Sequence, residues 1–272
     1  MNIWNSILFG IIQGLTELLP VSSSAHLAVL GNLFGLSGSG LNYQMFCCFL
    51  HFGTILAVLI SFWQDIFSMV LEIGTLARPS HSRNLPNARL FIMICLSTAP
   101  LFFLIPLSAK VDRLYYSSIF IGASTILTGI MLFVIDRIQG NEKSQTSMTM
   151  GDAILIGFCQ LVACIPGISR TATVYSSCLV TGLNRETALK YTYLLSLPAA
   201  FGVNVLHLVQ SADAGMNWKE VPLYLLGMAA AILSGLLAIR VMKNVVKRGK
   251  VSGFAYYCCV AGVLFIILTM IF

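Results

Sequence analysis

Glu17 and Arg170 are ionisable residues in stretches of sequence that are otherwise apolar, and each has hydroxyl residues beside it. A run of three serines, residues 22–24, follows Glu17, and Ser169 directly precedes Arg170. An ionisable side chain inside a membrane is energetically expensive, so its presence there indicates a functional site. An arginine fork with hydroxyl and backbone N–H donors at the start of a helix is typical of phosphate binding. The two segments therefore predict an anion site at which an acid and a base meet.

A nucleophile and a proton carrier are also present near the first of these segments. Gln13 and Glu17 are four residues apart and share one face of a helix, and His26 lies about one turn after Ser23. Chemistry on phosphate esters needs charge neutralisation, a positioned nucleophile and a proton donor for the leaving group. Arg170 and a divalent cation held by Glu17 and Gln13 would neutralise charge. The sequence leaves open whether His26 attacks directly or activates Ser23 or water.

The same residues have simpler interpretations. Hydroxyl residues in these positions can cap the helix that follows them, and Glu17 with Arg170 can form a purely structural ion pair. An ion pair alone accounts for neither the hydroxyls nor His26, so we favour the anion site. Its expected binding residues are Gln13, Ser22, Ser24, Ser169, Thr171 and Thr173.

The elements that must position these residues are membrane helices. Hydrophobic residues make up 57% of the 272 residues and charged residues 10%, which lies outside the range of soluble globular proteins. A spanning helix needs about 20 mostly apolar residues. We therefore expect one all-α polytopic membrane domain over residues 1–272, with about six full transmembrane helices. The windows free of Asp, Glu, Lys and Arg that can hold them are residues 18–64, 90–109, 114–135, 191–212, 221–239 and 251–272.

Basic residues flank these windows and set the expected orientation. Most of the 16 Lys and Arg residues fall in four clusters, at residues 78–89, 137–143, 185–190 and 240–250. By the positive-inside rule these clusters lie in the cytoplasm, which places both ends of the chain outside. Their position beside membrane helices also explains the net charge of +6 without a nucleic-acid partner.

Two stretches of the chain resemble each other. Gly, Gln, Pro and Ser recur in the same order in residues 10–23 and 157–169, with one residue deleted before the proline. Three full crossings are expected between the copies, so the copies face the membrane from opposite sides, as in inverted-repeat proteins with a site near the midplane. Pro20 and Pro166 interrupt each helix in mid-membrane, which predicts two re-entrant helical hairpins; two Pro-kinked spanning helices are the alternative. The expected repeats cover about 1–136 and 151–272, joined by a cytoplasmic linker at about 137–150.

The motifs around these prolines resemble those of a known family. The stretch from Gln13 to His26 (QGLTELLPVSSSAH) and the stretch from Pro166 to Thr171 (PGISRT) are similar to the two signatures of the bacterial undecaprenyl-diphosphate phosphatases, the BacA-type bacitracin-resistance proteins. The segment that starts at His51 (HFGTILAV) also resembles the helix after the first signature. The similarity extends over essentially the whole chain.

The resemblance implies an activity, a location and a cofactor. It implies hydrolysis of undecaprenyl diphosphate, a polyprenyl diphosphate lipid, to undecaprenyl phosphate, which recycles the lipid carrier for cell-wall synthesis and confers bacitracin resistance. It also implies a site open to the outer side of the bacterial plasma membrane and dependence on Mg²⁺ or Ca²⁺. In the family's terms, Glu17 matches the essential acid. Ser23 and His26 match the proposed nucleophile or base, and Ser169 with Arg170 matches the phosphate-binding pair.

The chain departs from the family pattern at a few positions. Ala25 replaces a usual Gly, and Thr171 replaces a Ser and keeps its hydroxyl. Val174 stands where the family has Thr, and the adjacent Thr173 points about 100° away on a helix. Gln13 occupies a position where Glu or Gln occurs, so the metal would rest on one protein carboxylate plus substrate oxygens, a mode that Mg²⁺ accepts.

A lipid-phosphate flippase or transporter is the main rival function, because inverted repeats with broken helices are also a transporter architecture. His26 beside Ser23, Glu17 and Arg170 favours hydrolysis, since transport needs binding but no nucleophile or proton relay. A membrane scaffold does not explain a buried acid and base. The sequence leaves a homodimer open.

Overall fold

In the computed structural model the chain is all-α, as expected. The structure describes residues 1–36, 41–76, 85–107, 117–138, 142–211 and 218–271. Within these ranges the only extended pairing is an isolated bridge between Lys143 and Leu183. The α-helices are α1 (Ile3–Leu18), α2 (Ser23–Leu33), α3 (Leu41–Ser61), α4 (Trp63–Leu76), α5 (Pro86–Thr98), α7 (Ser118–Asp136), α8 (Met150–Val162), α9 (Arg170–Val180), α10 (Arg185–Ser211), α11 (Val221–Arg248) and α12 (Ser252–Ile271), with 3₁₀ segments η2 (Ala99–Leu107) and η3 (Gln145–Ser147).

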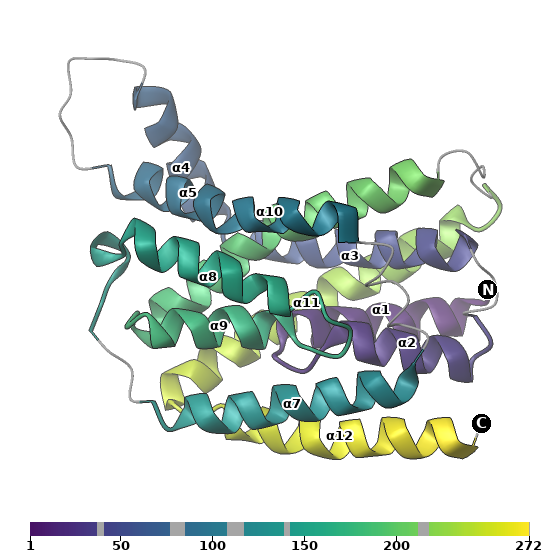
Figure 1. Ribbon diagram of the computed structural model, residues 1–272. Coiled ribbons are helices and arrows are strands. Elements are labelled where there is room, and N and C mark those ends of the chain that lie inside the picture. The colour runs from purple at the N-terminus through teal and green to yellow at the C-terminus, as the bar shows by residue number, and fades with distance from the viewer. Residues whose placement is uncertain (37–40, 77–84, 108–116, 139–141, 212–217, 272) are drawn as a thin grey trace.

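Long apolar helices lie side by side and form one bundle (Figure 1). Among the described residues, four segments are long and apolar enough to cross a membrane, at Asn42–Ser61, Pro86–Phe103, Ser118–Asp136 and Val221–Arg248. In addition, α10 has 27 residues and α12 is apolar over Ser252–Leu268. The chain is therefore a polytopic membrane protein, and the count of about six full spans stays a prediction.

Two helical hairpins enter this bundle from opposite ends, and their turns lie near its middle (Figure 1). One is formed by α1 and α2, the other by α8 and α9, and within each pair the helices are in contact. Neither pair continues as one kinked helix, so the alternative of two Pro-kinked spanning helices is wrong.

The proline in the first hairpin explains where α1 ends. A residue that precedes proline is disfavoured in the helical region, and Leu19, directly before Pro20, is extended with φ −90° and ψ 152°. The chain then turns through Ser22, which has a φ of +68°. The second hairpin turns at Gly167, whose φ is +91°.

Equivalent glycines of the two similar stretches pack against different helices. Gly10 on α1 lies so close to α11 that an added Cβ would overlap the carbonyl of Gly227. Gly157 on α8 lies close to α5, where an added Cβ would be 2.6 Å from the carbonyl oxygen of Ser97. The other extensive contacts join α3 to α10, α3 to α11 and α7 to α12. Each half of the chain thus packs on elements of the other half, and the repeat bounds stay a prediction.

Two features differ from the expected spans. Helix α4 was not anticipated; its Glu72 accepts hydrogen bonds from the backbone N–H groups of Asn87 and Ala88 at the start of α5. The span expected at residues 90–109 begins earlier, at Pro86, and changes from α to 3₁₀ geometry at Ala99. Parts of the expected loops lie outside the described residues, including Arg78, Arg83, Lys110, Arg113 and residues 139–141 of the linker.

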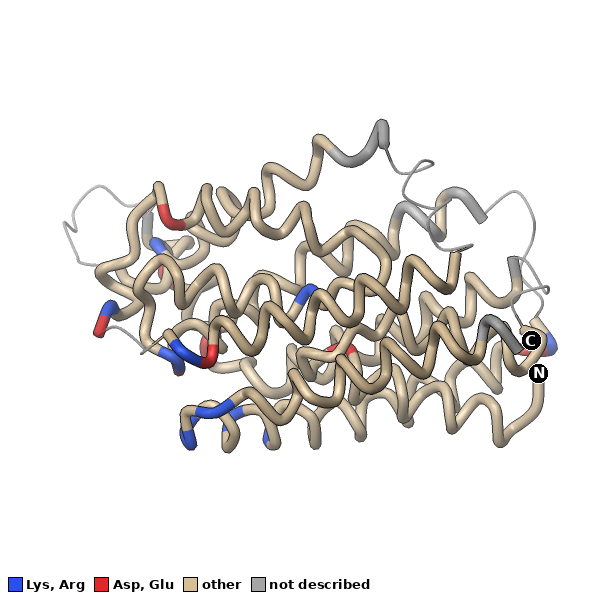
Figure 2. Tube along the Cα trace, turned by 60° about the horizontal axis from the view of Figure 1, so that its bottom comes forward, with Lys and Arg blue, Asp and Glu red and all other residues tan. Residues whose placement is uncertain are grey.

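Charge is unevenly distributed along the bundle. Figure 2 shows most of the drawn Lys and Arg residues at one end. Helix α1 begins and α12 ends at the opposite end (Figure 1). The predicted separation of the basic loops from both ends of the chain is therefore present in the fold.

Candidate functional site

The turns of the two hairpins bring Glu17 and Arg170 together. Nη1 of Arg170, at the start of α9, lies 3.8 Å from Oε1 of Glu17, near the end of α1. The two side chains are 24% and 12% exposed, so the pair is shielded from solvent without being sealed off. The sequence-based prediction that acid and base meet is confirmed.

The other carboxylate oxygen of Glu17 collects hydrogen-bond donors. The hydroxyl of Ser23 donates to Oε2 at 2.5 Å, and Nε2 of Gln13 donates to it at 3.3 Å. Gln13 and Glu17 therefore share one helical face, as their spacing predicts. The short distance from Ser23 places a candidate nucleophile in direct contact with a proton acceptor.

His51 is a member of this cluster that the sequence analysis did not include among the site residues. Its Nδ1 lies 2.8 Å from Nε2 of Gln13 and 3.7 Å from Oε2 of Glu17. The available signals were a histidine inside the long charge-free window at residues 18–64 and its place at the start of the segment that resembles the family. Neither signal indicated which residues His51 contacts, because α3 packs against α1 only in the tertiary fold.

The serines that begin α2 and α9 act as helix caps. Ser22 accepts a hydrogen bond from the N–H of Ala25 at 3.4 Å, and Ser169 accepts one from the N–H of Ala172 at 3.2 Å. Helix capping, the simpler role considered for these hydroxyls, is thus present in the structure. The two helix N-termini still bring positive dipole ends to the hairpin turns, where Arg170 also lies.

A second set of hydrogen bonds links the hairpin turns to each other and to α7. The hydroxyl of Ser24 accepts from the N–H of Gly167 at 3.3 Å. Thr128 on α7 donates to the carbonyl of Gly167 at 3.2 Å and accepts from the N–H of Ser169 at 3.1 Å. An added Cβ at Gly167 would be 2.5 Å from the carbonyl oxygen of Ile121, so only glycine fits this close approach. Thr128 thereby fixes the turn that carries Arg170.

The threonines of α9 have different roles. Thr171 donates to the carbonyl oxygen of Glu17 at 2.8 Å and so connects the two hairpins. Thr173 donates to the carbonyl of Ser169 in its own helix at 2.9 Å. Val174 is 1% exposed and belongs to the main hydrophobic core. The Thr173 hydroxyl is thus hydrogen-bonded to a carbonyl of its own helix, and the Val174 side chain packs in the core.

His26 is turned towards α12. Its Nδ1 lies 2.7 Å from the carbonyl oxygen of Ser22, and its Nε2 lies 2.7 Å from the hydroxyl of Tyr257. Among the described residues no hydrogen bond joins His26 to Ser23, Glu17 or Arg170. The structure therefore brings the predicted residues into two adjacent groups, one around Glu17 and one around His26.

The residues available for a divalent cation are few. Within the described parts of the chain no three His, Cys, Asp or Glu side chains cluster as a metal site would require. Glu17 offers a carboxylate, and Oε1 of the fully buried Gln13 has no hydrogen-bond partner. An unpaired buried carbonyl oxygen beside a carboxylate suits Mg²⁺ or Ca²⁺, which prefer oxygen ligands.

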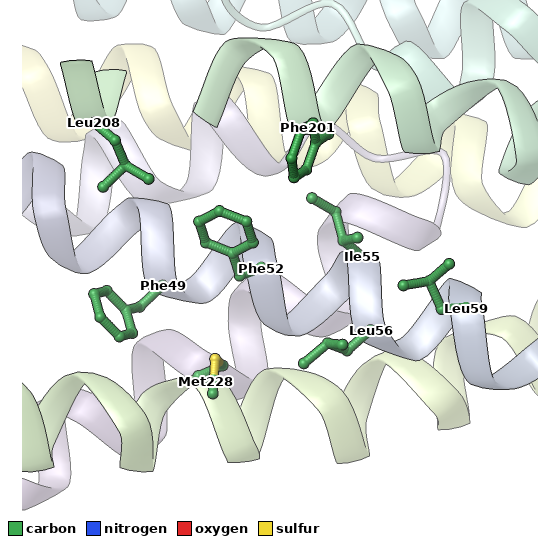
Figure 3. A pocket seen from close by; sticks show the side chains of 8 residues that line it. All are labelled: Phe49, Phe52, Ile55, Leu56, Leu59, Phe201, Leu208 and Met228. Atoms are coloured by element: carbon green, nitrogen blue, oxygen red, sulfur yellow. The ribbon is translucent and has the colours of Figure 1, made fainter. Parts of the chain in front are cut away.

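One apolar cavity in the described part of the chain is separate from this polar cluster. It has a volume of about 580 Å³ and lies between α3, α10 and α11 (Figure 3). Its lining is wholly apolar and includes Phe52, Ile55, Phe201 and Met228. None of its lining side chains is a donor for a phosphate group.

Comparisons with known proteins find relatives along almost the whole chain. Residues 6–264 match the family model described as Bacitracin resistance protein BacA. The chain is 35% identical over 272 residues to an undecaprenyl-diphosphatase of Carboxydothermus hydrogenoformans, with 98% of each chain covered. It is 34% identical to one of Desulforapulum autotrophicum, again with 98% of each covered, and 32% identical to one of Halothermothrix orenii over the full length of both. The chain belongs to the BacA family of bacitracin resistance proteins.

Proposed function

We propose that this chain is an undecaprenyl-diphosphate phosphatase: it hydrolyses undecaprenyl diphosphate to undecaprenyl phosphate and inorganic phosphate. In a bacterial cell this reaction recycles the lipid carrier for cell-wall synthesis and confers resistance to bacitracin. The names of the full-length relatives support the substrate. The observation that carries the chemistry is the contact of the Ser23 hydroxyl with Glu17 beside Arg170.

Binding of the diphosphate is assigned to the two hairpin turns. Arg170 holds phosphate oxygens with its guanidinium fork, and the N-terminal ends of α2 and α9 add N–H donors and positive dipole. Ser169 and Thr171 keep the turn of the second hairpin in place next to Glu17. The site is built from both halves of the chain, so the substrate bridges them.

The geometry favours Ser23 as the attacking group. Glu17 accepts the Ser23 proton as the Ser23 oxygen bonds to the terminal phosphorus, and the bond from that phosphorus to the bridging oxygen breaks. Undecaprenyl phosphate leaves with the bridging oxygen and takes the proton held by Glu17. Water then cleaves the phosphoserine to inorganic phosphate, and its proton passes to Nε2 of His26, which exchanges its hydrogen bond from Tyr257 for one from that water. In this mechanism Glu17, and not His26, activates Ser23. The sequence alone had left the role of His26 open.

Glu17 and Gln13 are the residues that would hold Mg²⁺ or Ca²⁺. A cation held by these residues would neutralise charge on the diphosphate. Arg170, on the other side of the Glu17 carboxylate, serves the same electrostatic purpose with a protein group.

We place the protein in the bacterial plasma membrane, with the site open to the outer side. The support is the concentration of Lys and Arg at one end of the bundle, which the positive-inside rule assigns to the cytoplasm. The lipid substrate reaches the site from within the membrane.

The test is phosphate release by purified protein in detergent, with undecaprenyl or farnesyl diphosphate and Mg²⁺ or Ca²⁺. Wild type should release phosphate, and Glu17→Ala, His26→Ala and Arg170→Ala should each lose most of the activity. Wild-type release no faster than that of the three variants rules the phosphatase out. Lipid-phosphate transport without hydrolysis, measured in proteoliposomes, would support the flippase alternative.

A further inference from the structure

Both ring nitrogens of His26 have a hydrogen-bond partner, and together the partners fix its protonation. Nδ1 lies 2.7 Å from the carbonyl oxygen of Ser22. A carbonyl oxygen only accepts hydrogen bonds, so Nδ1 carries a proton. In the neutral ring Nε2 is then the bare nitrogen, and it accepts a hydrogen bond from the hydroxyl of Tyr257 at 2.7 Å.

Ring contacts hold the imidazole in the same place. The rings of His26 and Tyr257 are almost parallel, with an angle of 6° and centroids 5.7 Å apart. Phe265, two turns further along α12, packs its ring edge-to-face on His26 at 5.2 Å. His26 is 8% exposed. Two aromatic residues of α12, in the second half of the chain, thus pack around a histidine of the first half.

The partner on Nδ1 is held by an unusual backbone conformation. Ser22 has a φ of +68°, a region that residues other than glycine rarely adopt. Such strained residues persist where the surrounding structure determines them, and they cluster at functional sites. The carbonyl of Ser22 therefore presents a fixed acceptor to the His26 ring.

We propose that Tyr257 is a positioning residue for His26. Its hydroxyl donates to Nε2 in the tautomer that the Ser22 carbonyl sets, and so keeps the imidazole ring in one orientation. Because a phenol both donates and accepts, the same contact serves neutral imidazole and, after Nε2 gains a proton, imidazolium. Among the described residues, the hydrogen bond and the ring contact of Tyr257 with a predicted site residue are both with His26. The proposal rests on the proposed function, in which His26 handles a proton.

The decisive variant is Tyr257→Phe, which keeps the stacked ring and removes only the hydroxyl. At metal sites, loss of a group that orients a ligating imidazole lowers affinity or activity by about 10- to 100-fold, and we take the same range for Tyr257→Phe. We expect that loss in kcat, with KM changed less than about twofold and the melting temperature retained. Tyr256→Phe is the matched control, because Tyr256 is the adjacent residue and packs on Phe133 with its ring. It should keep wild-type kcat.

A double variant and a spectrum separate positioning from general support. If Tyr257 acts only through His26, Tyr257→Phe should lower kcat no further in a His26→Ala background. In protein labelled with ¹⁵N-histidine, which has four His residues, the Nε2 signal of His26 should differ between wild type and Tyr257→Phe because the hydrogen bond from Tyr257 is lost, while Nδ1 stays protonated in both. Wild-type kcat in Tyr257→Phe, an additive loss in the double variant, or an unchanged Nε2 signal each overturns the proposal. A wild type without hydrolysis refutes the proposed function instead, and the Nε2 signal then still decides the positioning of His26.

Discussion

The carboxylate of Glu17 contacts both hairpins. Its Oε2 accepts a hydrogen bond from the Ser23 hydroxyl, with an oxygen–oxygen distance of 2.5 Å, and its Oε1 lies 3.8 Å from a guanidinium nitrogen of Arg170. The two oxygens of one carboxylate thus have different tasks. One is next to the candidate nucleophile, and the other is next to Arg170, to which we assign phosphate binding. The predictions below test how far activity and stability depend on this arrangement and on the packing around it.

Removing the Ser23 hydroxyl should abolish most of the hydrolysis. In Ser23→Ala we expect kcat to fall by about 100-fold or more, because a positioned nucleophile and its proton transfer contribute about that much. Phosphate release measures it. Ser176→Ala is the control: the Ser176 hydroxyl is buried without a hydrogen-bond partner, so its loss should leave activity unchanged. Equal activity of both variants would exclude Ser23 as the attacking group.

Arg170→Lys should weaken substrate binding although it keeps the charge. A lysine ammonium cannot reproduce the planar fork that binds two phosphate oxygens, so KM should rise by about tenfold. The KM for farnesyl diphosphate is the measurement. Arg185→Lys is the control, because Arg185 donates to the carbonyl of Gly249 in the basic end of the bundle. An unchanged KM in Arg170→Lys would show that the guanidinium does not contribute to substrate binding.

Thr128→Val should disturb the second hairpin turn. It removes the partner of both the Gly167 carbonyl and the Ser169 N–H, and an unpaired buried backbone group costs about 1 to 3 kcal/mol. We expect a lower melting temperature together with a higher KM. Thr125→Val is matched to it on the same helix, since Thr125 donates only to the carbonyl of Ile121. Equal effects of the two variants would contradict a specific role for Thr128.

Gly157→Ala should destabilise the contact between α8 and α5. The added Cβ would be 2.6 Å from the Ser97 carbonyl oxygen, and overpacking of this kind costs about 1 to 3 kcal/mol. Thermal unfolding in detergent measures the loss. Gly202→Ala serves as the control, because nothing lies within 4 Å of its added Cβ and it is also in a helix. A melting temperature that falls equally in both variants would refute the packing argument.

Val174→Thr, which restores the residue type that the family has at this position, should not raise activity. Val174 lies in the hydrophobic core and is 1% exposed, so a hydroxyl there would lack solvent. We expect the free energy of unfolding to fall by about 1 to 3 kcal/mol, measured by thermal unfolding. An increase in kcat would instead place this side chain in the site.

The sequence was sufficient for the parts of the site that depend on local physics. Glu17 and Arg170 stood out because a charge in an apolar segment needs a reason. Pro20 marked the end of α1 through its effect on the residue before it, whereas α8 ends at Val162, before Pro166 is reached. Gln13 and Glu17 met because four residues make about one helical turn. These inferences needed no knowledge of how distant helices pack.

The parts that were missed depend on tertiary contacts. His51 joins the site because α3 packs on α1, and Thr128 supports the Gly167 turn because α7 lies against α9. Helical spacing placed His26 near Ser23 correctly, but the direction of its ring is decided by Tyr257 on α12. No local pattern contains that information, since 231 residues separate the two rings along the chain.

The joining of the hairpins has a consequence for biosynthesis. Arg170 follows Glu17 by 153 residues, which at ~5–20 residues per second takes roughly 8 to 30 seconds to synthesise. During that interval the newly inserted first hairpin contains an acid in the membrane without its arginine. Protonation of the nascent Glu17, or delayed entry of the hairpin until the second half emerges, would relieve this. The order in which the ribosome delivers the two halves is therefore part of how the site is completed.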